Sequence, residues 1–390
     1  MTDHRLELAD VIRTHERDFL ARWNHVLSRE HRKALRNLRD CRTAALGGHL
    51  QQCDRCGHRV ILYNSCRNRH CNKCQATARA RWLAQRQAEL LPVPYFHVVF
   101  TLPQQIARLA LQNPKQIYAI LFRAASETLL AIAAEPRHLG ASIGFLAVLH
   151  TWGQNLHLHP HLHCVVPGGG ISSDGSRWIA CRPSFFLPVR VLSRLFRKKF
   201  LKSLGAAYRK GALHLSGKLE PLTASAAFRA LCRKAACIEW VVYAKPPFGG
   251  PERVLKYLAR YTHRVAISNH RLQALEDGRV RFAAKDYSDH GRTKTMTLDA
   301  VEFIRRFLLH VLPAGFVRIR QFGFLANRVR KQKLERCRVL LAPRQPDLLD
   351  SPAGADALGE DPHRCPTCKL GRMIVIELFS VPPIAAHDTS

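Results

Sequence analysis

Residues 154–166 read Gln-Asn-Leu-His-Leu-His-Pro-His-Leu-His-Cys-Val-Val, and histidine occupies every second position in the middle of this segment. Successive side chains of a β-strand point to opposite faces, so an extended segment places all of these imidazoles on one face. The other face carries Leu158, Leu162 and Val166 and is expected to pack on a core. The histidines are His157, His159, His161 and His163.

Pro160 interrupts the histidine pattern. Proline has no amide hydrogen for a sheet ladder, so it favours an edge strand, a bulge or a break just before His161. The regular unit is then His161-Leu162-His163, with two imidazoles about 7 Å apart along one face. Imidazole is the commonest metal ligand, so we interpret the pair as a metal site rather than as a polar face exposed to water. Pro160 argues against all four histidines binding one ion.

The composition points to a globular protein with a polyanionic partner. The 390 residues suffice for two or three domains, and 47% of them are hydrophobic. Lys and Arg total 61 against 29 acidic residues, a formal net charge of +32, and nucleic acid is the commonest partner of such a chain. We find no apolar run of membrane-spanning length and no signal-peptide core at the start. We therefore expect a cytoplasmic, nucleoid-associated protein.

Several of the 13 cysteines form Cys-x-x-Cys pairs, which in a cytosolic chain are typical of zinc sites rather than disulfides. Two such pairs, separated by 14 residues, suit one tetrahedral zinc whose closed shell gives it an architectural role. The expected ligands are Cys53, Cys56, Cys71 and Cys74. Cys66 and His70 are candidates to replace one pair or to hold a second ion.

A third pair, Cys365 and Cys368, follows residues 344–362, which are rich in Pro, Gly, Asp and Ala and are expected to form a linker. No second Cys-x-x-Cys pair lies near it in the sequence. His363 and Cys337 are candidate partners, and the sequence leaves open whether this pair binds zinc.

Periodicity predicts an α+β fold. Strands are expected at 95–102, 144–150, 238–244 and 316–320, and helices at 76–91, 104–134, 301–312 and 326–338. The order predicts a small antiparallel sheet with flanking helices, preceded by a helical segment and a zinc-binding domain. The expected domains are an N-terminal helical segment (1–46), the zinc-binding domain (47–91), a catalytic domain (92–340) and a linker with a C-terminal tail (341–390).

Tyr257 and Tyr261 lie one helical turn apart in a segment that follows a proline-rich loop. Taken alone, such a pair is more typical of packed core aromatics. Cations surround it, and alternating arginines mark the strand expected at 316–320, so both groups are candidates for phosphate contacts. These candidates are Lys256, Arg260, Arg264, Arg318 and Arg320.

Together the histidine pair, the tyrosine pair and the basic charge suggest phosphoryl transfer. A divalent ion bound by His161 and His163 can neutralise charge that develops on a phosphodiester, and a tyrosine hydroxyl can attack in line. The products are a covalent 5′-phosphotyrosine and a free 3′-hydroxyl, so the bond energy is kept for rejoining. Two tyrosines allow two successive transfers.

These motifs resemble those of a known enzyme family. His161-Leu162-His163 matches the His-hydrophobic-His signature of the HUH endonucleases. Residues 257–264 are similar to the paired-tyrosine motif of the rolling-circle transposases of that class, and residues 65–75 are similar to their zinc-binding domain. The order of the three motifs agrees as well, so the chain resembles transposases of the insertion sequence ninety-one type over roughly residues 40–335.

The resemblance implies a transposase that nicks and rejoins single-stranded DNA at element ends, with Tyr257 and Tyr261 as nucleophiles. It also implies Mg²⁺ or Mn²⁺ held by His161, His163 and a third ligand. His159 and Gln154 both qualify, and strand parity favours His159. His150 and His157 are assigned to structure or to substrate contact.

Three alternatives remain open from the sequence. A replication initiator or relaxase would use the same chemistry at an origin. A non-enzymatic zinc-dependent DNA-binding protein would need no tyrosine nucleophile. A zinc hydrolase built on the histidine cluster would form no covalent DNA adduct.

Overall fold

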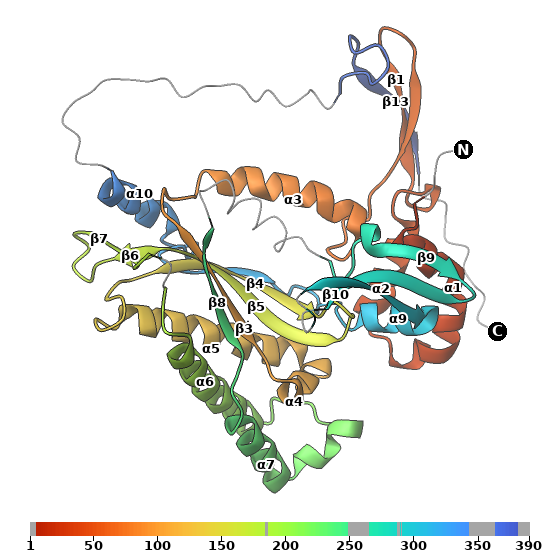
Figure 1. The fold of residues 1–390 in the computed structure, drawn as a ribbon. Helices are drawn as coiled ribbons and strands as arrows, with labels where there is room; N and C mark the ends of the chain where they lie inside the picture. Colours follow the sequence, from red (N-terminus) through yellow and green to blue (C-terminus); the bar gives the residue numbers. More distant parts are fainter. Residues whose placement is uncertain are drawn as a thin grey trace, which may run out of the picture.

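The structure is a computed structural model that describes residues 5–183, 186–248, 265–286, 289, 291–342 and 363–380 (Figure 1). Its centre is a five-stranded antiparallel sheet with the strand order β12-β4-β5-β3-β8. The strands are β3 (Tyr95–Thr101), β4 (Gly144–Trp152), β5 (Leu158–Pro167), β8 (Val242–Phe248) and β12 (Ile319–Gly323). The predicted α+β class, a small antiparallel sheet with flanking helices, is confirmed.

One face of this sheet packs on α5 (Pro114–Ala134) and α6 (Val189–Arg209), with α4 (Gln104–Ala107) and α7 (Ser225–Ala236) beside them (Figure 1). Phe100, Leu162 and Phe196 are completely buried in this core. Contrary to the sequence expectation, α5 is long and apolar enough to cross a membrane, alone among the described helices. Because 67% of its apolar window is buried inside the fold, α5 is a core helix.

The other face of the central sheet carries the histidines near one end and packs on α3 (Asn72–Gln87) near the other. Trp82 of α3 contacts a small apolar cluster that contains Val148 and Val165. The last helix, α10 (Arg330–Leu341), packs through Leu334 and Cys337 in a neighbouring cluster. A hairpin of β6 (Gly169–Ile171) and β7 (Trp178–Ala180) lies next to it.

A second core lies beside the histidine end of the sheet. It joins α1 (Leu8–Trp23), α2 (Arg29–Asp40) and α9 (Ala300–Leu308) to a three-stranded sheet of β9 (Leu272–Glu276), β10 (Arg279–Asp286) and β11 (Arg292–Asp299). Asp277 and Gly278 both have positive φ, 49° and 69°, as a two-residue hairpin turn requires. Trp152 and Leu156 are buried in the same core, so it anchors the loop between β4 and β5.

A third sheet projects from the main body (Figure 1). It consists of β1 (Gly48–Cys53), β2 (Arg59–Tyr63) and β13 (Met373–Phe379), with β1 in the middle. The C-terminal tail therefore shares a sheet with the hairpin near the N-terminus. Short 3-10 helices complete the described elements: η1 (Asn24–Val26), η2 (Ala44–Leu46), η3 (Arg108–Leu111), η4 (Gly217–Thr223) and η5 (Asn269–Arg271).

Candidate active site and metal centres

Pro160 lies in a bulge of the central strand β5, not on an edge strand. His161 pairs with His150 of β4, but the next recorded pair is Leu158 with Trp152. Two residues of β5, His159 and Pro160, therefore lie opposite the single residue Thr151.

Three imidazoles form a cluster on the sheet face opposite the main core. One ring nitrogen from each of His150, His161 and His163 lies within 4.8 Å of the others. The ring centroids of His161 and His163 are 4.7 Å apart, and His150 lies 4.5 Å from His163. The third donor thus comes from the neighbouring strand β4.

The cluster contains a different third histidine from the one that strand parity favours. His159 does not belong to the cluster of histidines found among the described residues, whereas His150, assigned above to structure or substrate contact, does. Gln154, the other candidate, lines the cavity over this cluster. The His159 ring lies beside the cluster, with its centroid 5.1 Å from that of His161, but its nitrogens are not among the grouped donor atoms. Cross-strand pairing, which sequence periodicity does not reveal, brings His150 opposite His161 instead.

Neighbouring groups contact the Nδ1 atoms of two rings in this cluster. His161 Nδ1 lies 2.6 Å from the carbonyl oxygen of His159, and His163 Nδ1 lies 2.8 Å from His97 Nε2. Burial, followed by the charge of Lys245, lowers the pKa of His97 to about 3, so its ring is neutral. These contacts orient both rings, and Nε2 of His161 and of His163 would be the atoms that bind an ion.

A cavity of about 730 Å³ opens over the cluster, lined by the histidines and by residues of β8, β10 and β11. Three lysines contribute to it: Lys245, Lys285 and Lys294. Lys294 forms a 2.6 Å ion pair with Asp286, and the Lys245 ammonium lies 5.8 Å from the centroid of the Tyr243 ring. Positive charge beside aromatic rings is the chemistry that binds a nucleic-acid strand.

The loop before β5 is held by buried groups that the sequence did not single out. Arg271 donates hydrogen bonds to the carbonyl oxygens of Gln154 and Ala283, each at 2.6 Å. His310 Nε2 lies 3.0 Å from the Leu156 carbonyl, and its Nδ1 lies 3.1 Å from Thr151 Oγ1. Burial lowers the pKa of His310 to about 4. These contacts fix the β4–β5 connection. Arg271 and His310 lie in none of the sequence motifs described above, so no pattern pointed to them.

The predicted arginine face of residues 316–320 is corrected by the structure. Arg318 is 9% exposed and donates to Gln75 Oε1 at 3.0 Å, and burial lowers its pKa to about 10. The guanidinium of Arg318 is therefore buried and hydrogen-bonded to Gln75, and it is not available to a phosphate. Arg320 is partly buried and stacks 4.2 Å from the ring centroid of Phe122.

The tyrosine pair cannot be placed. Tyr257 and Tyr261 lie outside the described residues, and so do the candidate phosphate contacts Lys256, Arg260 and Arg264. Their roles stay predictions.

The cysteines form two clusters, and the predicted grouping of Cys53, Cys56, Cys71 and Cys74 is corrected. Cys71 and Cys74 lie with Cys41 and Cys66, whereas Cys53 and Cys56 lie with the C-terminal pair. The reason is the length of β1, whose six residues carry Cys53 about 17 Å from the base of the hairpin.

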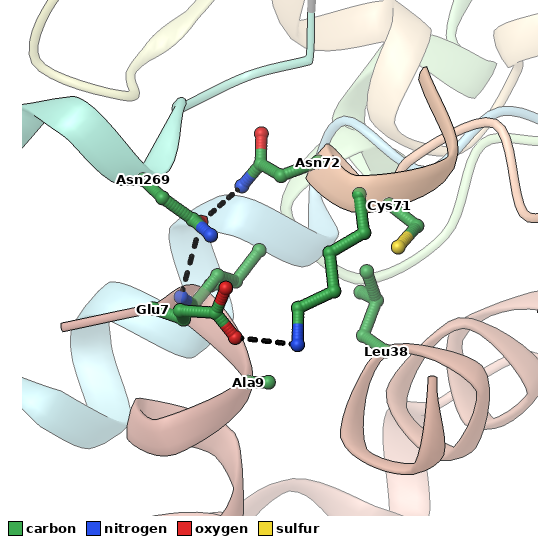
Figure 2. A pocket seen from close by; sticks show the side chains of 8 residues that line it. Glu7, Ala9, Leu38, Cys71, Asn72 and Asn269 are labelled. Carbon is green, nitrogen blue, oxygen red and sulfur yellow. Dashed lines mark hydrogen bonds and ion pairs between the residues drawn. The ribbon is translucent and has the colours of Figure 1, made fainter. Parts of the chain in front are cut away.

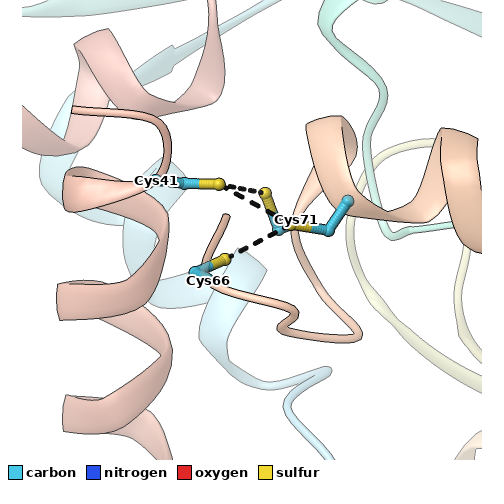
Figure 3. Close-up of side chains that lie close together, drawn as sticks. Cys41, Cys66 and Cys71 are labelled. Carbon is cyan, nitrogen blue, oxygen red and sulfur yellow. Dashed lines mark hydrogen bonds between the residues drawn. The ribbon is translucent and has the colours of Figure 1, made fainter. Parts of the chain in front are cut away.

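The first cluster lies between the end of α2 and the start of α3 (Figure 3). Its sulfur atoms are separated by 3.5 Å (Cys41–Cys71), 3.6 Å (Cys41–Cys74) and 3.7 Å (Cys66–Cys74). A zinc tetrahedron with bonds of about 2.3 Å has sulfur–sulfur edges of about 3.8 Å. Hydrogen bonding from Cys66 lowers the pKa of Cys71 to about 5, which favours the thiolate.

Cys66, one of the additional candidates, lies in this cluster, and His70 does not. His70 Nε2 instead accepts a hydrogen bond from the Leu312 amide at 3.4 Å, and burial lowers its pKa to about 3. Cys41 was missed because it is a lone cysteine 12 residues before the first pair.

Polar contacts tie this cluster to the second core (Figure 2). Lys73 of α3 forms a 2.6 Å ion pair with Glu7 at the start of α1. Asn269 Oδ1 accepts hydrogen bonds from Asn72 Nδ2 and from the Leu8 amide, at 2.6 Å and 3.3 Å. The knuckle of Cys71 and Cys74 is thus connected to the elements that anchor the histidine loop.

Comparison with known proteins shows the family. The family model "Putative transposase" matches residues 144–333, and "Transposase zinc-binding domain" matches residues 11–102. A protein of Sinorhizobium fredii named "Putative transposase y4qJ" is 55% identical over 98% of both chains. The chain belongs to the IS91-type transposases.

A more distant relative agrees with this assignment. "Transposase for insertion sequence element IS801" of Pseudomonas savastanoi pv. phaseolicola is 30% identical, over 84% of this transposase and 79% of that protein. No solved structure matches the chain. The zinc-binding domain and the cysteine clusters support structural zinc in the transposase, and its substrate is DNA.

Proposed function

We propose that the transposase nicks and rejoins single-stranded DNA at the ends of its element, through a covalent 5′-phosphotyrosine on Tyr257 or Tyr261. This chemistry would drive rolling-circle transposition in the cytoplasm. The observation that carries the proposal is the cluster of His150, His161 and His163 on the floor of a cavity lined by lysines.

The residues fit a divalent ion. His150, His161 and His163 would hold it, and when bound it supplies neutralisation of charge on the phosphoryl oxygens. The described cluster contains three imidazoles and no carboxylate, so it favours Mn²⁺ over Mg²⁺. His97 and the carbonyl oxygen of His159 contact Nδ1 of His163 and of His161, so Nε2 of each ring would bind the ion.

The bonds that form and break in the reaction belong to a phenol and a phosphodiester. The tyrosine oxygen forms a bond to phosphorus, the bond from phosphorus to the 3′-oxygen breaks, and the phenolic proton ends on the released 3′-hydroxyl. Lys245, Lys285 and Lys294 would hold the backbone of the strand against the cluster. Attack on the 5′-phosphotyrosine by a 3′-hydroxyl reverses these steps and rejoins the strand.

Chain length supports the participation of Tyr261. Ala266 packs in the same buried core as Trp152, which stacks on His150 with ring centroids 4.7 Å apart. Tyr261 precedes Ala266 by five residues, and five residues span at most about 18 Å. This short connection to a core that also contains Trp152 supports Tyr261 as a nucleophile at the histidine cluster.

The test is formation of a covalent adduct on single-stranded DNA that carries an element end, in the presence of Mn²⁺. The unchanged protein should yield a protein–DNA band resistant to denaturation, and mass spectrometry should map it to Tyr257 or Tyr261. The variant Tyr257→Phe plus Tyr261→Phe should give no adduct. Tyr63→Phe is the matched control, because Tyr63 is an exposed residue of β2.

Two outcomes would overturn the proposal. An adduct that persists in the double variant removes the tyrosines as nucleophiles. A protein that binds the DNA equally well with and without the tyrosines, and never forms an adduct, is a zinc-dependent DNA-binding protein. A replication initiator or relaxase would nick an origin without strand transfer at element ends, and the similarity to transposases favours transfer.

A further inference from the structure

The second cysteine cluster joins opposite ends of the chain. Sγ of Cys53 lies 3.7 Å from Sγ of Cys368, and Sγ of Cys56 lies 3.7 Å from Sγ of Cys365. A disulfide would require about 2.05 Å. These separations match instead the edge of about 3.8 Å expected for four thiolates around zinc.

Both pairs are built as metal knuckles. The residue after each second cysteine is left-handed, with φ of 70° at Gly57 and 58° at Lys369. Backbone amides donate to the sulfur atoms, from Cys56 to Cys53 Sγ at 3.5 Å and from Gly371 to Cys368 Sγ at 3.3 Å. Such donors orient thiolate ligands and stabilise their charge.

Gly371 is required by the close approach of the two knuckles. A Cβ atom at this position would lie 2.4 Å from Cys53 Sγ and 2.6 Å from Asp54 Oδ1. Asp54 Oδ1 in turn accepts a hydrogen bond from the Arg372 amide at 2.8 Å. The C-terminal knuckle is thus shaped to dock against the N-terminal one.

Apolar packing contributes little to holding the tail in place. The core of this sheet consists of Cys53, Cys365 and Met373, with Val60 and Cys368 partly buried against it. Along β13, Ile374 and Val375 are about half exposed and Leu378 is 79% exposed. A small sheet with so little buried surface is marginal by itself, and metal binding is the usual source of the missing stability.

We propose that Cys53, Cys56, Cys365 and Cys368 bind a second zinc ion, which fastens the C-terminal strand β13 to the β1–β2 hairpin. Four thiolates in a closed shell favour zinc over harder ions. The site lies only partly within the matched zinc-binding domain, because Cys365 and Cys368 follow residue 333 and both family models end at or before it. It acts independently of the proposed DNA chemistry.

The first test is the zinc content of the purified full-length protein. Elemental analysis should find two zinc ions per chain, and one in Cys365→Ser plus Cys368→Ser. The matched control, Cys232→Ser plus Cys237→Ser, removes two cysteines outside both clusters and should retain two. Two zinc ions in the first variant, or a disulfide in place of the metal, would overturn the proposal.

The second test is hydrogen exchange of residues 373–379. The single variant Cys56→Ser should accelerate their exchange at least tenfold, although Cys56 lies more than 300 positions away. Protection of β5 should be unchanged, which shows that the central fold is intact. If a variant that has lost one zinc ion showed unchanged protection of β13, the proposal that zinc fastens β13 to the hairpin would be overturned.

Discussion

The histidine cluster and the cysteine clusters are both candidate sets of metal ligands, but they are assembled over very different distances along the chain. The three histidines come from two adjacent strands and span residues 150–163. The second cysteine cluster joins residues 53–56 to residues 365–368. Local periodicity therefore identified two of the three clustered histidines, His161 and His163. Sequence spacing, by contrast, grouped Cys53 and Cys56 with Cys71 and Cys74, which lie in a different cluster.

The comparison also separates two kinds of metal chemistry. The histidine cluster faces a large cavity, and its three donors leave coordination positions for a substrate. Each cysteine cluster supplies four sulfur donors and leaves none. The first arrangement is suited to reaction at the metal, and the second to holding chain segments together.

The largest expected effect distinguishes His150 from His159. His161→Ala or His150→Ala should reduce adduct formation at least about 100-fold, because each removes a donor from the cluster. His159→Ala should stay within about threefold, because the His159 ring, although its centroid lies 5.1 Å from that of His161, supplies no donor atom to the cluster, and the variant keeps the carbonyl oxygen that contacts His161. Measured rates of adduct formation check this. A defect in His159→Ala as large as in His150→Ala would support His159 as the third ligand, as strand parity predicts.

The next effect concerns the first cysteine cluster. Cys41→Ala should remove its zinc and destabilise the protein by several kcal/mol, because metal binding contributes directly to folding. Cys181→Ala, outside both clusters, is the control. Thermal unfolding with parallel zinc analysis measures both quantities. Full zinc content in Cys41→Ala would show that Cys41 is not a ligand.

His97 should act on the metal through His163. His97→Ala removes the 2.8 Å contact with His163 Nδ1 and should weaken apparent Mn²⁺ affinity about 10- to 100-fold. At saturating Mn²⁺ the rate should recover, because His97 is a positioning residue. A Mn²⁺ titration of adduct formation separates the two effects. A rate that stays low at saturation would give His97 a direct role in the reaction.

The lysines of the cavity and the buried Arg318 should differ in their salt dependence. Lys285→Ala should reduce the slope of log affinity for single-stranded DNA against log salt by about 0.7, the contribution of one phosphate contact. Arg318→Met should leave this slope unchanged and lower stability, because Arg318 bonds to Gln75. Binding isotherms at several salt concentrations check both. A lower slope for Arg318→Met would place it on the DNA surface.

The last effect is a pH dependence of stability that comes from His310. Its pKa falls from 6.5 to about 4 on folding, so the unfolded chain binds the proton more tightly. This contribution to stability is present above pH 6.5 and is lost as pH falls toward 4, by up to about 1.4 kcal/mol per unit. Comparing denaturant unfolding of His310→Gln with the unchanged protein between these pH values isolates it. If the stabilities of the two proteins changed with pH in the same way, His310 would not be the source of this pH dependence.

Much of the fold was predictable because it depends on local patterns. The run Tyr95–Thr101 and the alternation after His161 specify strands, and Asp277-Gly278 specifies a hairpin. The helix expected at 104–134 is broken near Asn113, because Pro114 has no amide hydrogen and begins the new helix α5. The side chain of Asn113 also bonds to the backbone of His214, a contact that no local pattern contains. The strand expected at 238–244 begins only at Val242, since Trp240 packs into the core.

The sequence by itself determined the types of candidate ligand, which are imidazoles on one strand face and thiolates in Cys-x-x-Cys pairs. It also gave the net positive charge that indicates a polyanionic partner. Only the tertiary structure decided which ligands meet. His150 joins His161 because two strands pair, and Cys53 joins Cys368 because β13 adds to β1. Side-chain type and spacing are encoded locally, whereas strand pairing depends on the packing of the whole chain.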